Sequence, residues 1–394
     1  MAPPRSDAPD PEGTADGTRQ SPWLTVETAL TRVDPGDRLL MMPGRYGAIE
    51  ISDVQFDGRP LILVPEMANT VTATAIRVLG ARNIVIRGIQ VTQTGVDGAA
   101  PLIETDADAA QIRFERMELR GAPDAEDYRS WDRSEWASGR RPIGAVLRGE
   151  GDALIASRLT AVATGLVASG RGADIRGNLI RGFSSDGLQI LAPGAQVVAN
   201  RVEDCIDTGA RTAGIRARAP ARETLDGLAV EGNIVLEWTV RTHPLRCALT
   251  GIALVGGVYG DVSVRNNLVI VSALDGIVAN GTVLGVIANN TVVSPGGQPG
   301  EHPRIALRAE ATDGATVANN IAMSYGGLPD AQRRNIAARY PARLFRDIVR
   351  GDFRPKAGSG LIDTADPGAA PSHDIGGIAR GQTPDFGAFE AIAQ

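Results

Sequence analysis

Short apolar runs follow one another through the middle of the chain, and turn-forming residues separate them. The runs are rich in Val, Ile and Leu, and they are broken by Gly, Asn and Asp. A helix would need apolar residues at 3.6-residue spacing over a longer stretch, and that spacing is missing here. The pattern therefore predicts a succession of short β-strands.

These strands belong to a repeat. A glycine followed by aliphatic residues recurs at intervals of 21, 22, 27, 37 and 25 residues, and a second strand with an asparagine follows most copies. The glycines are Gly144, Gly165, Gly187, Gly214, Gly251 and Gly276, and the asparagines are Asn178, Asn200, Asn233, Asn267 and Asn290. So short a unit cannot bury its own apolar face, so neighbouring units must stack. We predict a parallel β-helix with an internal asparagine ladder. The alternative, a β-sandwich, would need two-residue hairpin signals, which are scarce.

The core of a solenoid grows along one axis, so the length of 394 residues is compatible with one elongated domain. Residues 1–21 are rich in Pro, Asp and Gly and are expected to form a disordered leader. Residues 22–327 are expected to form the β-helix, in which 22–34 would be an N-terminal capping helix. Residues 328–394 change character and are expected to form a C-terminal tail that packs along the coil or caps it, with a helix at 330–338.

The composition limits the classes of function. Aromatic residues make up only 4% and glycines number 47, which suits a narrow core with many tight turns. The net charge of −6 does not favour nucleic-acid binding. No stretch approaches the roughly 18 apolar residues of a membrane span, and the first residues lack the regions of a signal peptide. Either an export signal was replaced by Met1, or the protein never had one.

Two cysteines are present, Cys205 and Cys247. Each precedes a repeat glycine on adjacent predicted coils, so the pair is placed to bridge two neighbouring loops. A disulfide would imply an oxidising compartment. Isolated buried thiols are also common, and the sequence leaves both interpretations open.

Both ends of the coil region carry characteristic segments. The opening segment is Asp34-Pro-Gly-Asp-Arg-Leu-Leu-Met-Met-Pro-Gly-Arg-Tyr-Gly47, and the closing ones are Gly358-Ser-Gly-Leu-Ile-Asp363 and Pro384-Asp-Phe-Gly-Ala-Phe-Glu390. With the Gly and Asn coils, they resemble the right-handed parallel β-helix superfamily of polysaccharide-acting proteins. It includes pectate-lyase-like and chondroitinase-B-like lyases, polygalacturonase-like hydrolases, uronate epimerases and tailspike depolymerases. The resemblance implies an all-β, single-stranded right-handed parallel β-helix, secreted or periplasmic, and monomeric, or trimeric if it is a tailspike.

Titratable residues gather on adjacent coils. With Leu188 and Ile215 inward, strand alternation points Gln189, Arg216 and Arg218 outward. Long inserts at 203–212 and 239–250 flank this outward stripe, and inserts on one side of a solenoid mark its binding face. The candidate residues of this region are Asp186, Gln189, Glu203, Asp204, Asp207, Arg211, Arg216, Arg218, Arg241, His243 and Arg246. They predict a site for an acidic polysaccharide, in which guanidinium groups hold carboxylates. The alternative is that coil corners favour Asp and that Arg is the abundant solubilising residue.

Two reactions compete for this region. The superfamily resemblance implies that a lyase would use Lys or Arg as its base; Lys356 is the only lysine, so Arg216, Arg218 or His243 would serve with the neighbouring acids. We favour this β-elimination. A hydrolase of polygalacturonase type would use Asp186 and Asp204, which lie in Ser-Ser-Asp-Gly and Glu-Asp-Cys elements similar to those of that family, although its Gly-His-Gly element has no match. A non-catalytic carbohydrate-binding or spike protein is the third alternative.

Metal binding and aromatic stacking are further candidates. A Ca²⁺ site built from Asp186, Asp204 and Asp207 is one option, whereas no Cys/His spacing indicates zinc. The insert at 122–142 carries Tyr128, Trp131 and Trp136 among charged residues. These aromatic rings would either stack on sugar rings or cover an apolar flank of the coil.

Overall fold

The computed structural model of this chain describes residues 1–2, 15–93, 100–138, 141–209, 211–219, 223–240, 242–308, 314–328 and 334–391. The chain divides into two compact units, Met1–Gly182 and Phe183–Gln394. Among the described residues, no helix is long and apolar enough to cross a membrane. The expected leader falls mostly on residues 3–14, which lie outside the described residues.

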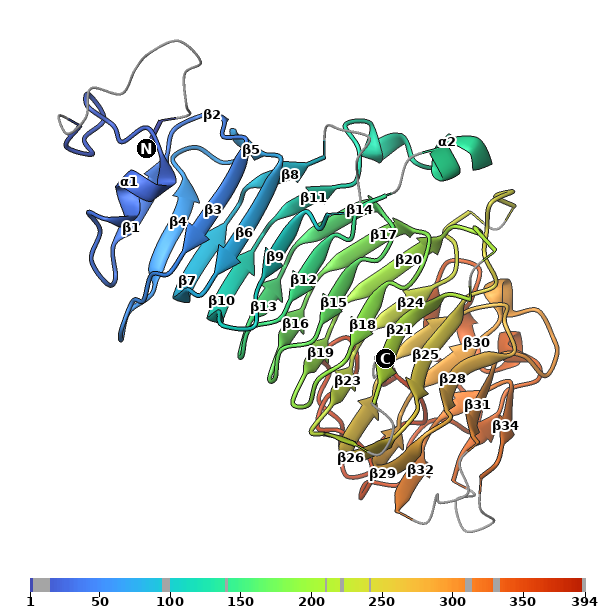
Figure 1. Cartoon of the computed structure of the whole chain (residues 1–394). Coiled ribbons are helices and arrows are strands. Elements are labelled where there is room, and N and C mark those ends of the chain that lie inside the picture. Colours follow the sequence, from blue (N-terminus) through green and yellow to red (C-terminus); the bar gives the residue numbers. More distant parts are fainter. Residues whose placement is uncertain are drawn as a thin grey trace. The chain divides into compact units, whose positions relative to one another are not determined.

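Each unit is a coil of parallel strands, and each turn of the coil adds one strand to each of three sheets, A, B and C (Figure 1). In the first unit, sheet A contains β1 (Arg38–Met41), β4 (Leu61–Pro65), β7 (Arg82–Arg87), β10 (Ala110–Glu115), β13 (Ala153–Ile155) and β16 (Asp174–Arg176). Sheet B contains β2 (Gly44–Arg45), β5 (Val71–Ala73), β8 (Gln90–Thr92), β11 (Glu118–Arg120) and β14 (Arg158–Val162). Sheet C contains β3 (Ala48–Ser52), β6 (Ala75–Leu79), β9 (Ile103–Thr105), β12 (Ala145–Leu147) and β15 (Leu166–Ala168). The first unit ends within β17 (Leu179–Phe183).

The second unit repeats this plan. Sheet A contains β19 (Gln196–Val198), β23 (Ala229–Glu231), β26 (Val258–Arg265), β29 (Thr282–Ala288) and β32 (Ala315–Ala318), and β22 (Thr224–Asp226) pairs with β26. Sheet B contains β20 (Arg201–Cys205), β24 (Ile234–Leu236), β27 (Leu268–Ile270), β30 (Thr291–Val293), β33 (Ile321–Ala322) and β35 (Ile336–Ala337). Sheet C contains β18 (Leu188–Ile190), β21 (Ala213–Arg218), β25 (Thr250–Val255), β28 (Asp275–Ala279), β31 (Arg304–Leu307) and β34 (Ser324–Gly326). The predicted all-β parallel β-helix is confirmed.

Identical side chains stack inside the second unit. On sheet C, Ile215, Ile252 and Ile277 are register partners on successive strands, and each is at most 1% exposed. On sheet B, Val235 and Val269 stack in the same way. Such in-register stacking buries apolar area at every rung and fixes the register of the coil.

The valine stack explains why a glycine recurs in the repeat. A Cβ atom on Gly214 would overlap the side chain of Val235, and one on Gly251 would overlap Val269. Neither glycine has a positive φ angle, so lack of space, rather than an unusual backbone conformation, excludes a side chain there. The repeated glycine therefore reflects the close packing of sheet B against sheet C.

The predicted asparagine ladder is present at the corner between sheets A and B of the second unit, called the A–B corner below. Each amide nitrogen donates to the side-chain oxygen of the next asparagine, at 3.0 Å for Asn200 to Asn233 and for Asn233 to Asn267, and at 2.9 Å for Asn267 to Asn290. The same oxygens accept backbone N–H groups. The residue before each asparagine turns the corner in the left-handed region, as in Ala199 with a φ of 54°.

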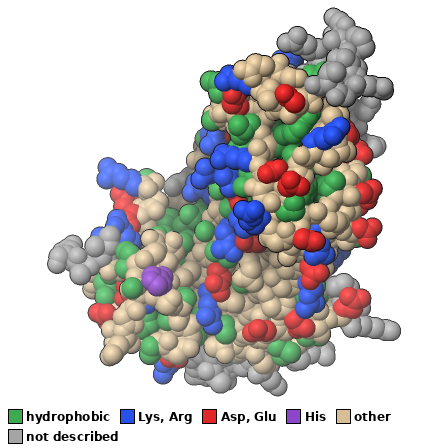
Figure 2. Space-filling model, turned by 90° about the vertical axis from the view of Figure 1, so that its left-hand side faces the viewer, with side chains coloured by type: hydrophobic (Ala, Val, Ile, Leu, Met, Phe, Trp, Pro, Cys, Tyr) green, Lys and Arg blue, Asp and Glu red, His purple; other side chains and the backbone are tan. Residues whose placement is uncertain are grey.

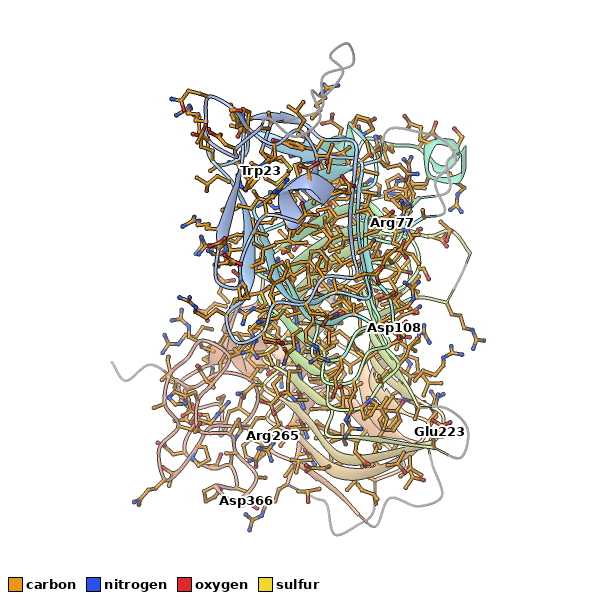
Figure 3. The ribbon with its side chains drawn as sticks, turned by 60° about the vertical axis from the view of Figure 1, so that its left-hand side comes forward. Trp23, Arg77, Asp108, Glu223, Arg265 and Asp366 are labelled. Atoms are coloured by element: carbon orange, nitrogen blue, oxygen red, sulfur yellow. A yellow bond between two sulfur atoms is a disulfide. The ribbon has the colours of Figure 1, made fainter. Side chains whose placement is uncertain are left out.

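Both ends of the chain add structure to the coil. Helix α1 (Val26–Leu30) begins at Thr25, whose hydroxyl accepts the Thr28 N–H at 3.1 Å, and it is shorter than the helix predicted over 22–34. Trp23, labelled in Figure 3, lies at the same end of the first unit. An insert follows β11 in the first unit and contains η1 (Ala125–Asp127) and α2 (Arg133–Ser138).

The C-terminal tail packs along the outside of sheet B in the second unit. Its elements are η3 (Pro341–Arg343) and the antiparallel pair β36 (Phe345–Asp347) and β37 (Asp352–Pro355). The short helix η2 (Pro295–Gly297) lies before the tail, between β30 and β31. Phe345 and Phe386 of the tail share an apolar cluster with Leu268 and Ile321 of the sheet. The helix expected at 330–338 is wrong for its described part, because 336–337 form β35 and extend sheet B.

Many charged side chains on the outer surface form ion pairs with side chains of neighbouring rungs. Acidic and basic side chains are interleaved on the face shown in Figure 2. In the first unit, Glu104 on sheet C pairs with Arg77 at 3.0 Å and with Arg148 at 3.1 Å. Exposed pairs of this kind contribute little to stability, but they leave few side chains free for ligands.

Candidate functional site

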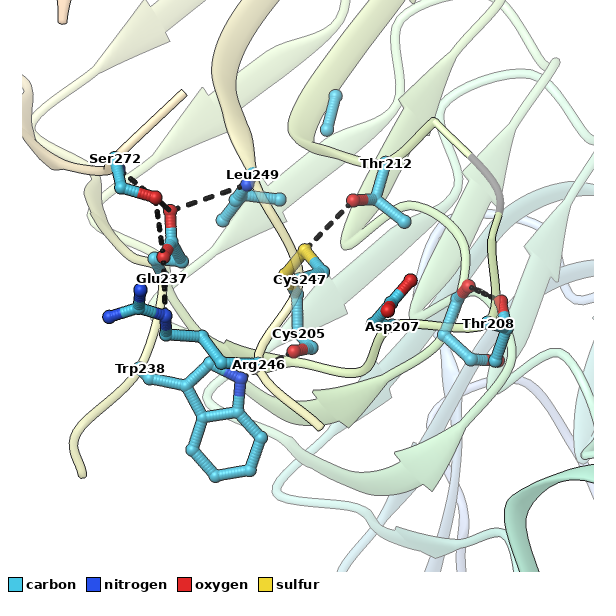
Figure 4. The surroundings of a disulfide bond; sticks show 12 residues. Cys205, Asp207, Thr208, Thr212, Glu237, Trp238, Arg246, Cys247, Leu249 and Ser272 are labelled. Atoms are coloured by element: carbon cyan, nitrogen blue, oxygen red, sulfur yellow. Dashed lines mark hydrogen bonds and ion pairs between the residues drawn. A yellow bond between two sulfur atoms is a disulfide. The ribbon is translucent and has the colours of Figure 1, made fainter. Parts of the chain in front are cut away.

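The second unit carries two long connections at the corner between sheets B and C, called the B–C corner below. The first connects β20 to β21, and the second connects β24 to β25. Figure 4 shows that a disulfide joins Cys205 to Cys247, with their Cα atoms 5.6 Å apart. The bridge that the sequence left open is therefore formed, and it links the two connections covalently.

Hydrogen bonds reinforce this link. The backbone N–H of Asp207 donates to the Leu245 carbonyl at 2.7 Å, and that of Cys247 donates to the Cys205 carbonyl at 3.2 Å. The Asp207 carboxylate accepts the Gly209 N–H at 3.0 Å, so it shapes its own loop. Asp207 thus has a structural contact where a substrate-binding role was predicted.

Arg216 is held on the outer face of β21 by a buried carboxylate. Asp186 accepts Nε of Arg216 at 2.8 Å and Nη2 at 3.0 Å, and it is only 3% exposed. Nη2 also donates to the Arg211 carbonyl at 3.2 Å. Nη1 has no hydrogen bond among the described residues. Because the fork of the guanidinium is fixed on one side, its remaining nitrogen is positioned to bind an incoming carboxylate.

The same carboxylate also organises its surroundings. Asp186 accepts the Ala213 N–H at 2.8 Å and the Gln189 side-chain amide at 2.8 Å. All its oxygens are therefore engaged. Asp186 positions Arg216, and Gln189 supports Asp186, so neither is free for the catalytic and substrate-binding roles predicted for them.

Arg218 lies two residues further along β21 and is exposed. It has no ion pair among the described residues, so its guanidinium is open to solvent. The end of this strand is anchored by Tyr259 of β26, whose hydroxyl donates to the Ala217 carbonyl at 2.9 Å and accepts the Ala219 N–H at 3.1 Å. Burial raises the pKa of the Tyr259 hydroxyl above its ordinary value, so Tyr259 stays neutral.

His243 stacks on Trp238 within the second connection. The ring centroids are 4.0 Å apart and the planes differ by 8°. Nδ1 of His243 accepts the Leu245 N–H at 3.2 Å, which leaves the proton of a neutral ring on Nε2. The stacking makes His243 half-buried and fixes its orientation.

Arg246 is committed to a buried acid. Its Nε donates to Glu237 at 3.1 Å, and the Glu237 side chain is fully buried. Glu237 also accepts the Ser272 N–H at 2.7 Å and the Leu249 N–H at 3.3 Å. This pair braces the second connection, which corrects the predicted substrate-binding role of Arg246. Arg211 is exposed and contributes its carbonyl to Arg216, whereas the predicted Arg241 lies outside the described residues.

Asp204 does not fit the acid or base of a hydrolase. It is fully buried, and its carboxylate accepts the Thr239 N–H at 2.7 Å and the Thr239 hydroxyl at 2.9 Å. A group that gives a proton to a bound sugar needs access to that sugar, and burial removes it. The pairing of Asp186 with Asp204 is therefore corrected to two separate structural roles.

The donor set for the expected Ca²⁺ site is also missing. Among the described residues, no three His, Cys, Asp or Glu side chains come together closely enough to hold a metal ion. Asp186, Asp204 and Asp207 each bind backbone N–H groups of different loops.

A second arginine lies on the same face of sheet C. From Arg216, the outward positions on the next strands are Ala253 and Val278, which are register partners. Arg304 on β31 donates from Nε to Asp275 at 3.1 Å, in the same manner as Arg216 to Asp186. Three rungs separate β21 from β31, which is about 14 Å at the usual strand spacing.

The aromatic insert of the first unit does not present open rings. Tyr128, Trp131 and Trp136 are 1%, 5% and 4% exposed, and the centroids of the two indoles are 5.2 Å apart. Arg141 stacks over Trp131 at 4.2 Å. A sugar would need an exposed face, so the predicted stacking role is corrected in favour of the alternative, a packed side loop.

Glu237, Trp238 and Arg304 were missed by the sequence analysis. Glu237 and Trp238 directly follow β24, at the start of the long connection to β25. Their position beside this insert could have indicated that they belong to the site. Arg304 lies at an outward position of β31, a strand that no repeat glycine directly precedes.

Comparison with known proteins supports the fold. No family model matches the sequence, and no curated protein does either. Among solved structures, the pectate lyase Pel9A is 14% identical, with 95% of this chain and 92% of that chain covered and a TM-score of 0.53. A rhamnogalacturonan lyase is 15% identical, with 83% of each chain covered and a TM-score of 0.47. The Dettilon tailspike protein is 13% identical, with 79% and 65% covered and a TM-score of 0.43. The pectate lyase alone of these three has a TM-score above 0.5, and at 14% identity this likeness shows that the two chains share a fold, the parallel β-helix.

Proposed function

We propose that the second unit binds a uronate-containing polysaccharide across the outer face of sheet C and cleaves it by β-elimination. The observation that carries the proposal is the fixed guanidinium of Arg216. Asp186 holds two of its nitrogens, and Nη1 remains open on the outer face. A guanidinium fixed in this way suits the carboxylate of a uronate.

The chemistry follows from that contact. Neutralising the carboxylate makes the C5 proton of the sugar more acidic. A base removes this proton, the C5 electrons form a double bond to C4, and the bond from C4 to the glycosidic oxygen breaks. A proton must then reach the leaving oxygen. The reaction is thus a balanced elimination that needs one group to accept a proton and one to donate it.

Arg218 and His243 are the candidates for assisting these two transfers. The neutral ring of His243 has Nε2–H as its donor, so we assign His243 the hydrogen bond that stabilises the leaving oxygen, which then takes its proton from water. Arg218 is exposed and without an ion pair among the described residues, so we assign proton removal to it.

A specific observation also favours a second candidate, binding without cleavage. Every carboxylate described at the site is engaged: Asp186 with Arg216, Glu237 with Arg246, and Asp275 with Arg304. No described acid is left to move protons. In this alternative, the same guanidinium groups hold the polysaccharide and no bond breaks.

The disulfide bears on where the protein works. Disulfides persist in oxidising compartments, so we propose a secreted or periplasmic protein. The expected partner is an acidic polysaccharide, bound by a single chain, because the candidate side chains of the site all belong to one unit.

The test is incubation with a panel of uronate polymers, with the ultraviolet absorbance of the unsaturated product followed over time. β-Elimination predicts this absorbance, and Arg216→Met should lower the rate by about 10²–10³-fold. Arg176→Met is the matched control, because Arg176 forms an exposed ion pair with Asp174. Binding without absorbance would establish the second candidate, and new reducing ends without absorbance would contradict both.

A further inference from the structure

The outer face of sheet B in the first unit contains a groove that the proposed function does not use. Its volume is about 570 Å³, within the range of about 300–1,000 Å³ that is usual for small-molecule sites. Strands β2, β5 and β8 form its floor, and Pro123, at the start of the aromatic insert, is part of its wall.

The floor of the groove is a ladder of neutral polar side chains. Thr72 and Gln90 are register partners on β5 and β8, and Thr74 and Thr92 lie on the same outer face. The hydroxyls of Thr72 and Thr74 make no hydrogen bond among the described residues. The Gln90 amide donates to the Thr92 hydroxyl at 3.2 Å, so the proton of that hydroxyl stays available for a ligand.

The charge of the groove distinguishes it from the surrounding surface. Arg45 is the only charged residue among those that line it. On the next rungs, Glu118 of β11 pairs with Arg120 and with Arg158, so these charged side chains of sheet B bind one another there. An acidic polymer would meet a single cation in the groove, whereas a neutral sugar would meet hydroxyl and amide groups at the β5 and β8 rungs.

We propose that this groove binds a neutral oligosaccharide, laid along the coil axis across β2, β5 and β8. Successive rungs are about 4.8 Å apart, close to the length that one pyranose adds to an extended chain. One sugar would therefore meet Thr72 and Thr74, the next would meet Gln90 and Thr92, and a third would lie beside Arg45. Pro123 supplies an apolar wall for the less polar face of a ring. The groove is a binding site separate from the sheet C site, and it carries out no chemistry.

The test is affinity electrophoresis in native gels that contain glucan, mannan, xylan or galactan. At least one of these neutral polymers should retard the protein. In Thr72→Val/Thr92→Val, the dissociation constant should rise about 20-fold, because two hydroxyls are lost. Valine has the shape of threonine and suits a strand, so the fold should persist. Thr74→Arg, at an exposed position, blocks the groove by bulk and gives an independent variant.

Two controls separate this site from the sheet C site. Thr224→Val makes the same exchange at an exposed threonine on β22, and Arg216→Met impairs the sheet C site. Both should keep the retardation by the neutral polymer. The proposal is overturned if no neutral polymer retards the protein, if the groove variants bind as well as the wild type, or if Arg216→Met abolishes the retardation.

Discussion

The A–B and B–C corners of the second unit belong to the same coils, yet they are built differently. At the A–B corner, Asn233, Asn267 and Asn290 are fully buried and bond to one another in a regular ladder. At the B–C corner, the connections differ in length, and buried acids such as Asp186 and Glu237 each hold an arginine. One corner repeats a single arrangement, whereas the other differs from coil to coil in the length of its connection and in the partners of its acids.

The difference shows how the fold separates stability from recognition. A neutral amide ladder satisfies buried backbone groups without any net charge, so it can be stacked indefinitely. A buried carboxylate instead needs a cationic partner, and that partner can keep one nitrogen for a ligand. We therefore expect substitutions at the A–B corner to change stability and those at the B–C corner to change binding as well.

The largest effect is expected from Asn267→Ala. The side-chain oxygen of Asn267 accepts the backbone N–H and the amide of Asn233, at 2.9 and 3.0 Å. Removing it leaves both donors buried and unsatisfied, which should lower the free energy of unfolding by about 3–6 kcal/mol. Denaturant unfolding followed by circular dichroism measures this change.

The matched control is Asn280→Ala, because Asn280 is exposed. Its effect should stay within about 0.5 kcal/mol. Equal losses at Asn267 and Asn280 would contradict the role given to the ladder.

Removing the disulfide should have the next largest effect. Cys205 and Cys247 are separated by 42 residues, for which chain entropy predicts a loss of about 4 kcal/mol, and measured losses are typically about 2–4 kcal/mol. Unfolding of Cys205→Ala/Cys247→Ala, compared with the wild type with and without a reductant, measures it. If a reductant left the unfolding midpoint of the wild type unchanged, the covalent link would not contribute to the B–C corner.

A smaller loss of stability, together with a loss of ligand binding, is expected from Asp186→Asn. The exchange leaves the Arg216 guanidinium, whose side chain is 18% exposed, without its counter-charge. Removing one partner of a buried pair costs about 3–5 kcal/mol, and partial exposure reduces this to about 2–3 kcal/mol. Asp174→Asn is the control, because its pair with Arg176 is exposed. A stable Asp186→Asn variant with unchanged binding would remove Asp186 from the site.

The smallest effect is a gain from Ala199→Gly at the A–B corner. Ala199 is exposed and has a φ of 54°, a conformation that strains alanine but not glycine. The free energy of unfolding should rise by about 0.5–1 kcal/mol after the entropic cost of glycine is subtracted. The same exchange at Ala48, an exposed strand residue without a positive φ, should lower it. Changes of the same sign at the two positions would contradict the strain.

The sequence predicted the regular part of the molecule because that part is periodic. The recurrence of Gly214 and Gly251, and of Asn233 and Asn267, follows from contacts that every coil repeats. The outward direction of Arg216 followed from strand alternation for the same reason.

The irregular part could not be predicted in this way. Trp131 lies in an insert where no period defines an inner and an outer face, and Asp204 lies in β20 at a residue with a φ of 62°, which breaks the regular alternation. Both are buried although an exposed role was predicted for them. The pairing of Arg246 with Glu237 depends on the path of a connection whose length no other coil shares. Their residue types suggested that these groups belong to the site. Only the three-dimensional path of the chain shows which of them are buried or already paired with other residues.

The central claim is that Arg216, held by Asp186, recognises the carboxylate of a sugar. The most direct test is calorimetric binding of a uronate oligosaccharide and of its methyl ester to the wild type and to Arg216→Met. The account predicts that the wild type binds the acid more tightly than the ester by at least about tenfold, a difference of about 1.4 kcal/mol, and that this preference disappears in Arg216→Met. An equal preference for the acid in both proteins would contradict it.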